Sequence, residues 1–435
     1  MTTALEQWIE REYRHAAVAM MTSVSATGLV KERPGFGQSM RPAVGSIIAS
    51  PVPGAYDPDP DYFFHWFRDS AVVIDAVRLL FEAGHLREEA LTHFADFVQF
   101  SLALDDLDGR SLVSAPAWRD KVIPDFQKYV RPDEELTTVR GSAVTADTRV
   151  NPNGTIDISR WARPQHDGPP LRVLSVLKWM RKHKVTADAS KLLQRDLEFT
   201  AQHWRDPSFD IWEEESGHHY YTLRVAAAAL NDGGEFLRSD ALRAEAQVIY
   251  RMLDGFWRES GGYYTSRILP EGAKSAKELD IAVILSAVHT AGHGEAEVHT
   301  ARDPRMHATL ERLEALFGAA YLINHQLPKD RAPAMGRYQG DVYYSGGAYY
   351  FSTLGASEFC YLAAAAHVAG CEERRKWVEH GDGFLNTTRV YTPASGDLSE
   401  QFDQRTGEQT SAKHLAWSYA ALISCVTARQ AVVAR

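Results

Sequence analysis

The stretch Leu223-Arg224-Val225-Ala226-Ala227-Ala228-Ala229-Leu230 is apolar on nearly every face of a helix, and a charged stretch over residues 241–257 follows it closely. A helix that is apolar all round has to be surrounded by other elements, whereas an amphipathic helix covers a core with one face only. The two stretches therefore predict a buried helix packed beneath a surface helix.

The same alternation runs along the whole chain, with long loops before the apolar helices and short links after them. The predicted buried helices lie around residues 66–83, 168–180, 223–230, 281–288, 361–366 and 415–426. The predicted surface helices lie around residues 5–24, 87–102, 191–199, 241–257, 303–317 and 372–384. An inner ring of six helices inside an outer ring of six satisfies this pattern. We therefore predict an all-α fold, an (α/α)6 barrel, in which the long loops meet at one end.

Composition narrows the class of protein. The chain has 435 residues, of which 45% are hydrophobic and 24% charged, as in an ordinary globular protein. No linker or shift in composition marks a boundary, so we expect a single domain over residues 1–435. The formal net charge of -10 disfavours binding to nucleic acid or to an anionic membrane. The 11% aromatic content, with several rings beside charged residues, is typical of a sugar-binding cleft.

The ends of the chain and its cysteines exclude several other features. The N-terminal residues carry charges before any apolar run, and no run of 18 apolar residues occurs, so we expect no membrane span. As written, the chain is predicted to be cytoplasmic, or secreted or periplasmic if a signal peptide was removed. The three cysteines and the histidines have no metal-binding spacing. We expect no metal, no cofactor and a monomer.

The loop before residue 223 carries the most suggestive chemistry, Asp210-Ile211-Trp212-Glu213-Glu214-Glu215-Ser216-Gly217. Neighbouring carboxylates that are partly buried cannot all ionise easily, so one of them can keep its proton and act as a general acid. The competing interpretation is a solvated run of charge, which is the commoner meaning of three consecutive acids. The octet alone does not decide between them.

The other long loops favour the first interpretation, because each of them carries polar and aromatic residues. Arg68-Asp69 ends an aromatic run at the start of a helix, Arg337 lies between Gly336 and Tyr338, and Glu400 follows Ser399. Arg68-Asp69 also suits a structural salt bridge, Arg337 a loop tether, and Glu400 a solvated turn. The convergence of all these motifs on one end of a barrel predicts an active site there.

These motifs resemble glycoside hydrolase family 15, the glucoamylase family, over residues 5–426. The blocks that carry the resemblance lie at residues 62–69, 161–169, 210–214, 336–343 and 398–420. The resemblance implies the (α/α)6 fold and a single catalytic domain. It also implies an exo-acting hydrolase that releases β-D-glucose, with inversion, from the non-reducing ends of α-1,4-linked and possible α-1,6-linked oligosaccharides, without a cofactor.

By position in the motifs, the resemblance implies that Glu213 is the general acid and Glu400 the general base. Inversion requires room for a water molecule, so the two carboxyl groups of such enzymes stand about 6.5 to 9.5 Å apart. The charge of Glu214 would discourage ionisation of Glu213. The implied substrate-binding residues are Tyr62, Trp66, Arg68, Asp69, Trp161, Arg163, Trp212, Glu214, Arg337 and Trp417.

Two departures from the family pattern concern the binding of the leaving group. Residues 345–349 read Ser-Gly-Gly-Ala-Tyr where many members carry an Asn-Pro-Trp segment, and Glu215 occupies a position that is often apolar. Short maltooligosaccharides are therefore the expected substrates. The alternatives are a relative specific for isomaltose, dextran or trehalose, a catalytically idle barrel that binds glucan, and an (α/α)6 enzyme acting on β-linked sugars or uronates.

Overall fold

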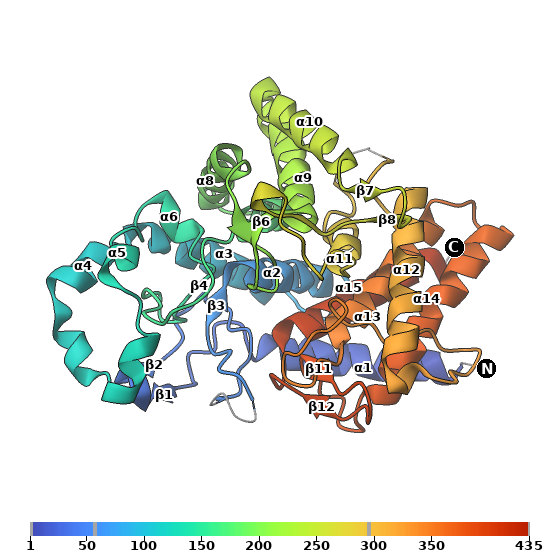
Figure 1. Ribbon diagram of the computed structural model, residues 1–435, viewed down its shortest axis with the longest axis horizontal. Helices are drawn as coiled ribbons and strands as arrows, with labels where there is room; N and C mark the ends of the chain where they lie inside the picture. The colour runs from blue at the N-terminus through green and yellow to red at the C-terminus, as the bar shows by residue number, and fades with distance from the viewer. Residues whose placement is uncertain (1–2, 55–58, 294–296, 434–435) are drawn as a thin grey trace.

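The computed structural model describes residues 3–54, 59–293 and 297–433, and within them long helices form two concentric rings (Figure 1). Each inner helix contacts the next, and α15 contacts α2, so the inner ring closes. The inner helices are α2 (Phe67–Glu82), α7 (Gly168–Lys182), α9 (Tyr220–Leu237), α11 (Ala282–His289), α13 (Tyr350–Ala365) and α15 (Ala416–Val433).

The outer ring packs around this inner ring, and every outer helix contacts an inner one. The outer helices are α1 (Ala4–Met21), α3 (Glu89–Ala103), α8 (Asp188–His203), α10 (Asp240–Asp254), α12 (Pro304–Ala320) and α14 (Glu372–Tyr391). The predicted (α/α)6 barrel and its division into buried and surface helices are confirmed.

Burial explains why the two kinds of helix alternate. In α11, every residue over 282–288 is buried, which requires an apolar side chain or a satisfied small polar one at each position. In α10, the buried residues are Ala246, Ile249 and Leu253, which lie three or four positions apart and form one stripe. The hydrophobic pattern of each helix therefore assigns it to its ring.

The region over residues 108–167 differs from its prediction as an irregular loop. It contains the short helices α4 (Gly109–Ser114), α5 (Asp133–Leu136) and α6 (Ser142–Thr145), which form a lobe beside the barrel at the left of Figure 1. These helices have four to six residues, too few to show a helical period in the sequence. A small apolar cluster around Leu136 joins the lobe to Phe67 of α2 and Phe100 of α3, and a second cluster lies around Val122.

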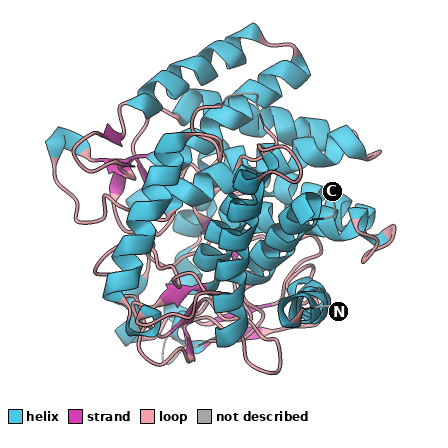
Figure 2. Cartoon of the chain, turned by 90° about the vertical axis from the view of Figure 1, so that its right-hand side faces the viewer, coloured by secondary structure: helices cyan, strands magenta, loops and turns pink. Residues whose placement is uncertain are grey.

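Short antiparallel strands occupy the loops, and Figure 2 shows them as small patches among the helices. They pair as β1–β2, β3–β4, β5–β6–β9, β7–β8 and β10–β11–β12. Their bounds are Lys31–Arg33, Gln38–Met40, His65–Trp66, Arg149–Val150, Ser208–Phe209, Ser216–His219, Trp257–Arg258, Tyr263–Tyr264, Arg267–Ile268, Ala348–Tyr349, Gln401–Phe402 and Gln409–Thr410, for β1 to β12 in order. Strands β3, β6 and β10 lead directly into α2, α9 and α13, so they fix the loops at the N-terminal ends of inner helices.

Candidate active site

The loop between β5 and β6 is a tight turn built around the carboxylate of Asp210. One oxygen of Asp210 accepts hydrogen bonds from the backbone N–H of Trp212 (2.9 Å) and of Glu214 (3.2 Å). The other oxygen accepts from the N–H of Glu215 (3.1 Å). Inside the turn, Glu213 has a φ of +65°, a left-handed conformation that is unfavourable for a residue with a side chain. The bonds to Asp210 therefore hold Glu213 in a backbone conformation that it would not adopt alone.

Arg267 fixes this turn to the neighbouring loop. Its guanidinium donates to Asp210 (2.9 Å) and to Asp280 (2.8 Å), and the indole N–H of Trp212 also donates to Asp280 (2.9 Å). Burial raises the pKa of Asp280 to about 6, although Arg267 acts in the opposite direction. Neither Arg267 nor Asp280 lies in a recognisable motif, so neither could be predicted from the sequence as part of this site.

Three donors from two segments surround the carboxylate of Glu213. The indole N–H of Trp66 (2.9 Å) and the guanidinium of Arg68 (3.1 Å) donate to Oε1, and the indole N–H of Trp161 donates to Oε2. The Glu213 side chain is 11% exposed. Contacts on both oxygens hold this carboxyl group in one orientation, as a catalytic acid requires.

Glu214 contacts a different set of groups. It accepts hydrogen bonds from Arg337 (3.1 Å), from the hydroxyl of Tyr338 (2.5 Å) and from the ammonium group of Lys277 (2.6 Å). Two cations therefore offset its charge, which weakens the predicted effect of Glu214 on the ionisation of Glu213. Glu215 accepts a hydrogen bond from Arg267 (2.8 Å), so the third glutamate of the octet stabilises the loop.

Glu400 lies immediately before β11 and is buried. One oxygen accepts from the hydroxyl of Tyr62 (3.2 Å), and the hydroxyl of Ser411 donates to the other. Burial raises the pKa of Glu400 to about 7, and the bond from Ser411 and the charge of Arg337 oppose this rise. The hydroxyl of Tyr62 also lies 2.9 Å from that of Tyr343. The sequence analysis did not identify Ser411 as a partner of Glu400.

A pocket at the loop end of the barrel gathers both predicted catalytic carboxyl groups and most of the predicted sugar-binding residues. Trp417 forms part of its wall and stacks on Phe351 with a ring separation of 4.2 Å. The residues that line the pocket are Tyr62, Trp66, Arg68, Asp69, Ile211, Trp212, Glu213, Arg337, Phe351, Glu400, Leu415 and Trp417.

Several polar atoms of this pocket have unused hydrogen-bonding capacity. Oδ2 of Asp69 and the indole N–H of Trp417 are buried, and neither makes a hydrogen bond to a described residue. Arg68 lies 3.4 Å from Asp69 and 3.4 Å from Asp167, both too long for strong ion pairs. Burial raises the pKa of Asp69 to about 6, with Arg68 opposing. Unpaired buried donors and acceptors of this kind suit a ligand that carries several hydroxyl groups.

Comparison with known proteins agrees with this geometry. Residues 36–427 match the family described as glycosyl hydrolases family 15. The chain belongs to this family. It is therefore a glycoside hydrolase.

Among curated relatives, the glucoamylase of Blastobotrys adeninivorans is 25% identical over 89% of this chain and 68% of that protein. The glucoamylase of Neurospora crassa is 26% identical over 99% of this chain and 69% of that protein. Among solved structures, the Hormoconis resinae glucoamylase has a TM-score of 0.77 and 23% identity, covering 97% of this chain and 73% of its own. The Saccharomycopsis fibuligera glucoamylase has a TM-score of 0.76 and 20% identity, covering 99% and 96%. These structures share the fold of this family 15 enzyme.

Three of the predicted site residues do not line the pocket of this family 15 enzyme: Trp161, Arg163 and Glu214. Trp161 and Glu214 contact it through Glu213 and Arg337, respectively. The guanidinium of Arg163 instead forms ion pairs with the buried carboxylates of Asp147 (2.8 Å) and Asp157 (2.9 Å), which belong to the lobe. These contacts favour a structural role for Arg163 over the predicted contact with substrate.

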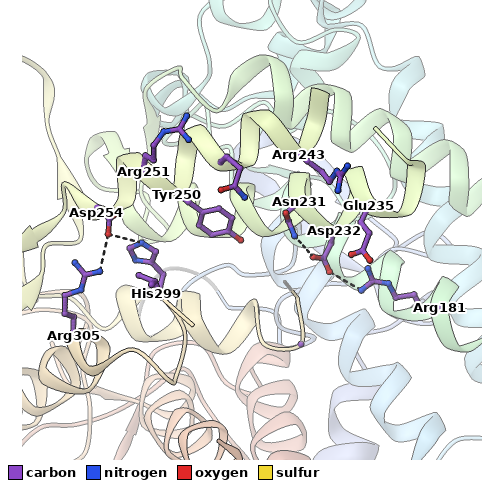
Figure 3. Close-up of a pocket in the computed structure, with 13 residues that line it drawn as sticks. Arg181, Asn231, Asp232, Glu235, Arg243, Tyr250, Arg251, Asp254, His299 and Arg305 are labelled. Atoms are coloured by element: carbon purple, nitrogen blue, oxygen red, sulfur yellow. Dashed lines mark hydrogen bonds and ion pairs between the residues drawn. The ribbon is translucent and has the colours of Figure 1, made fainter. Parts of the chain in front are cut away.

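A larger polar groove of about 1160 Å³ lies elsewhere on the family 15 enzyme, beside α9 and α10 (Figure 3). None of the predicted site residues lines it. Figure 3 shows two ion pairs within it, Arg305 with Asp254 (3.1 Å) and Arg181 with Asp232 (3.0 Å).

The described residues were also considered for metal binding and for crossing a membrane. Over residues 3–54, 59–293 and 297–433, no cluster of three or more His, Cys, Asp or Glu side chains is arranged to hold a metal ion. Over the same ranges, no helix combines the length and the apolar character needed to cross a membrane.

Proposed function

We propose that this family 15 hydrolase releases single β-D-glucose units, with inversion, from the non-reducing ends of α-1,4-linked oligosaccharides, and also from α-1,6-linked ones. The observation that carries the proposal is the pocket in which Glu213 and Glu400 lie with unpaired groups for sugar hydroxyls. The relatives named glucoamylase support the choice of an α-glucan. A pocket, unlike an open groove, receives the end of a chain, which supports exo-action.

In the proposed reaction, Glu213 starts protonated and donates its proton to the glycosidic oxygen as the bond to the anomeric carbon breaks. Glu400 starts ionised and removes a proton from a water molecule, whose oxygen attacks the anomeric carbon from the opposite face. The products are β-D-glucose and a chain shortened by one unit. Attack on the opposite face inverts the configuration, and the two carboxyl groups end with exchanged protonation states.

The contacts of each carboxyl group orient it for its proposed role. The donors Trp66, Arg68 and Trp161 orient Glu213. The hydroxyl groups of Tyr62 and Ser411 each donate to Glu400, which orients the base. Charged and aromatic groups elsewhere in the pocket bind the terminal sugar, through hydroxyl contacts from Asp69 and Arg337 and packing on Trp417.

Time-resolved NMR of the products from maltose, maltotetraose, isomaltose and trehalose tests linkage and stereochemistry together. We expect β-glucose to appear first from maltose and maltotetraose. Early α-glucose would overturn inversion. Faster hydrolysis of trehalose or isomaltose than of maltose would identify one of the alternative specificities.

Substitution tests the two roles in the same assay. Glu213→Gln and Glu400→Gln should each lower kcat by about 10²- to 10⁴-fold, the usual contribution of a general acid or base. Glu408→Gln is the matched control, because Glu408 is exposed on the same loop as Glu400. Near-normal turnover in either pocket variant would refute the assignment of that residue.

A further inference from the structure

A separate cavity of about 260 Å³ lies among the inner helices α2, α7, α11, α13 and α15. It is lined by residues from the C-terminal halves of α2 and α15, such as Asp75 and Ala428. The loops of the active site precede the N-terminal ends of these same helices. This axial cavity therefore lies toward the opposite end of the barrel from the active site.

Glu358 on α13 faces the axial cavity and has unused hydrogen-bonding capacity. The residue is 8% exposed, and one of its carboxyl oxygens accepts a hydrogen bond from the hydroxyl of Ser424 (2.5 Å). A carboxylate offers about four acceptor sites, so Glu358 can accept a hydrogen bond from a ligand while it keeps the bond from Ser424. Burial raises the pKa of Glu358 to about 7.

Lys178 on α7 supplies the complementary group. Its ammonium lies 2.9 Å from Asp75, which also accepts from Arg78 at 2.8 Å. An ammonium group carries three N–H donors, so Lys178 can donate to a ligand while it keeps Asp75. The cavity thus carries the acids Asp75 and Glu358 and the bases Lys178 and Arg78. This balance disfavours both an anion and a cation.

A neutral ligand with adjacent hydroxyl groups matches these contacts. One hydroxyl donates to Glu358, and its neighbour accepts from Lys178. The remaining wall is largely apolar, with Ala76, Ala420 and Ala428, and suits the C–H faces of a small ring. Drug-sized pockets have about 300 to 1,000 Å³, so a cavity just below this range fits a molecule of monosaccharide size.

We propose that the axial cavity binds one molecule of a small neutral polyol, D-glucose in this enzyme. The choice of glucose rests on the proposed function, of which it is the product, whereas the site rests on the side chains that line it. The axial cavity is thus a second sugar site, distinct from the pocket that contains Glu213 and Glu400.

Contacts through the barrel connect this second site to the active site. His289 lines the axial cavity, and its Nδ1 lies 2.6 Å from the hydroxyl of Tyr221. On its other side, the His289 ring lies 5.9 Å from the ring of Trp417, which lines the active-site pocket.

The test counts glucose sites by a ligand-observed NMR titration with D-glucose, which requires no turnover. The wild-type enzyme should bind glucose at two sites. Ala428→Leu, which fills the axial cavity, and Glu358→Leu, which removes its acceptor, should each leave one site. Val433→Leu is the control, because Val433 lies on the same helix α15, is exposed and does not line the cavity.

The same number of glucose sites in the wild type and in both cavity variants would overturn the proposal. If one of the two variants fails to fold, the other still tests the proposal. Thermal unfolding of each variant shows whether it is folded. The difference in the number of glucose sites between the wild type and the cavity variants is independent of the proposed function. An enzyme that releases no glucose from maltooligosaccharides can still show the axial site, and one that does release it can still lack the site.

Discussion

Substitution of Glu12 by Gln should stabilise the protein in a pH-dependent way. Glu12 lies on α1, is 1% exposed, and its Oε1 has no hydrogen-bond partner among the described residues. Burial raises its pKa from 4.5 to about 7, with Arg11 opposing the rise and Asp397 adding to it. The folded protein therefore favours the protonated, neutral form of this carboxyl group, which glutamine imitates.

The size of the effect follows from the two pKa values. Their difference, 7 − 4.5 = 2.5, corresponds to about 3 kcal/mol, since each pH unit contributes about 1.4 kcal/mol. Because the pKa of Glu12 is higher in the folded state than in the unfolded state, its contribution is fully present below pH 4.5. The contribution is lost as the pH rises through about 7. Glutamine does not titrate, so the variant keeps this free energy at high pH.

Urea unfolding of the wild type and of Glu12→Gln at about pH 5 and about pH 8 measures the effect. The free energy of unfolding of the variant minus that of the wild type should increase by as much as about 3 kcal/mol from pH 5 to pH 8. Glu10→Gln is the control on the same helix, since Glu10 is exposed and pairs with Arg14 at 2.6 Å. An identical difference between wild type and Glu12→Gln at both pH values would refute the argument from burial.

Three further predictions concern the active site and its surroundings. Ser411→Ala removes a hydrogen bond that lowers the pKa of Glu400, so this pKa should rise in the variant. Because the proposed base must be ionised, the acidic limb of kcat/KM should move to higher pH. An unchanged pH profile would contradict this. Trp161→Phe removes a donor to Glu213 and should lower kcat roughly 10- to 100-fold in steady-state assays. Arg163→Ala leaves the buried carboxylates of Asp147 and Asp157 without this cation, and should lower the free energy of unfolding in urea by about 3 to 5 kcal/mol. A raised KM without loss of stability would instead support the predicted substrate contact.

Much of the barrel was predictable, because the hydrophobic pattern that distinguishes a buried helix from a surface helix lies within the helix itself. The stretches over residues 223–230 and 282–288 are apolar on every face, and no position outside a core suits such helices. The loop motifs also placed Glu213 and Glu400 at one end of the barrel before any contact was known. The short helices α4 to α6 were not predicted, since helices of four to six residues are too short to show a hydrophobic period.

By itself, the sequence determined the alternation of buried and surface helices, and hence the barrel, together with the residue types of the acid and base loops. Only the tertiary structure decided which groups surround them, such as Ser411 on Glu400 and Arg267 on Asp210, 57 residues apart. It also turned Arg163 toward the lobe and placed Glu358 and Lys178 in one cavity shared by five helices. The reason is physical: periodicity is set by neighbours along one helix, whereas burial and hydrogen bonding depend on segments that meet only when the chain has folded.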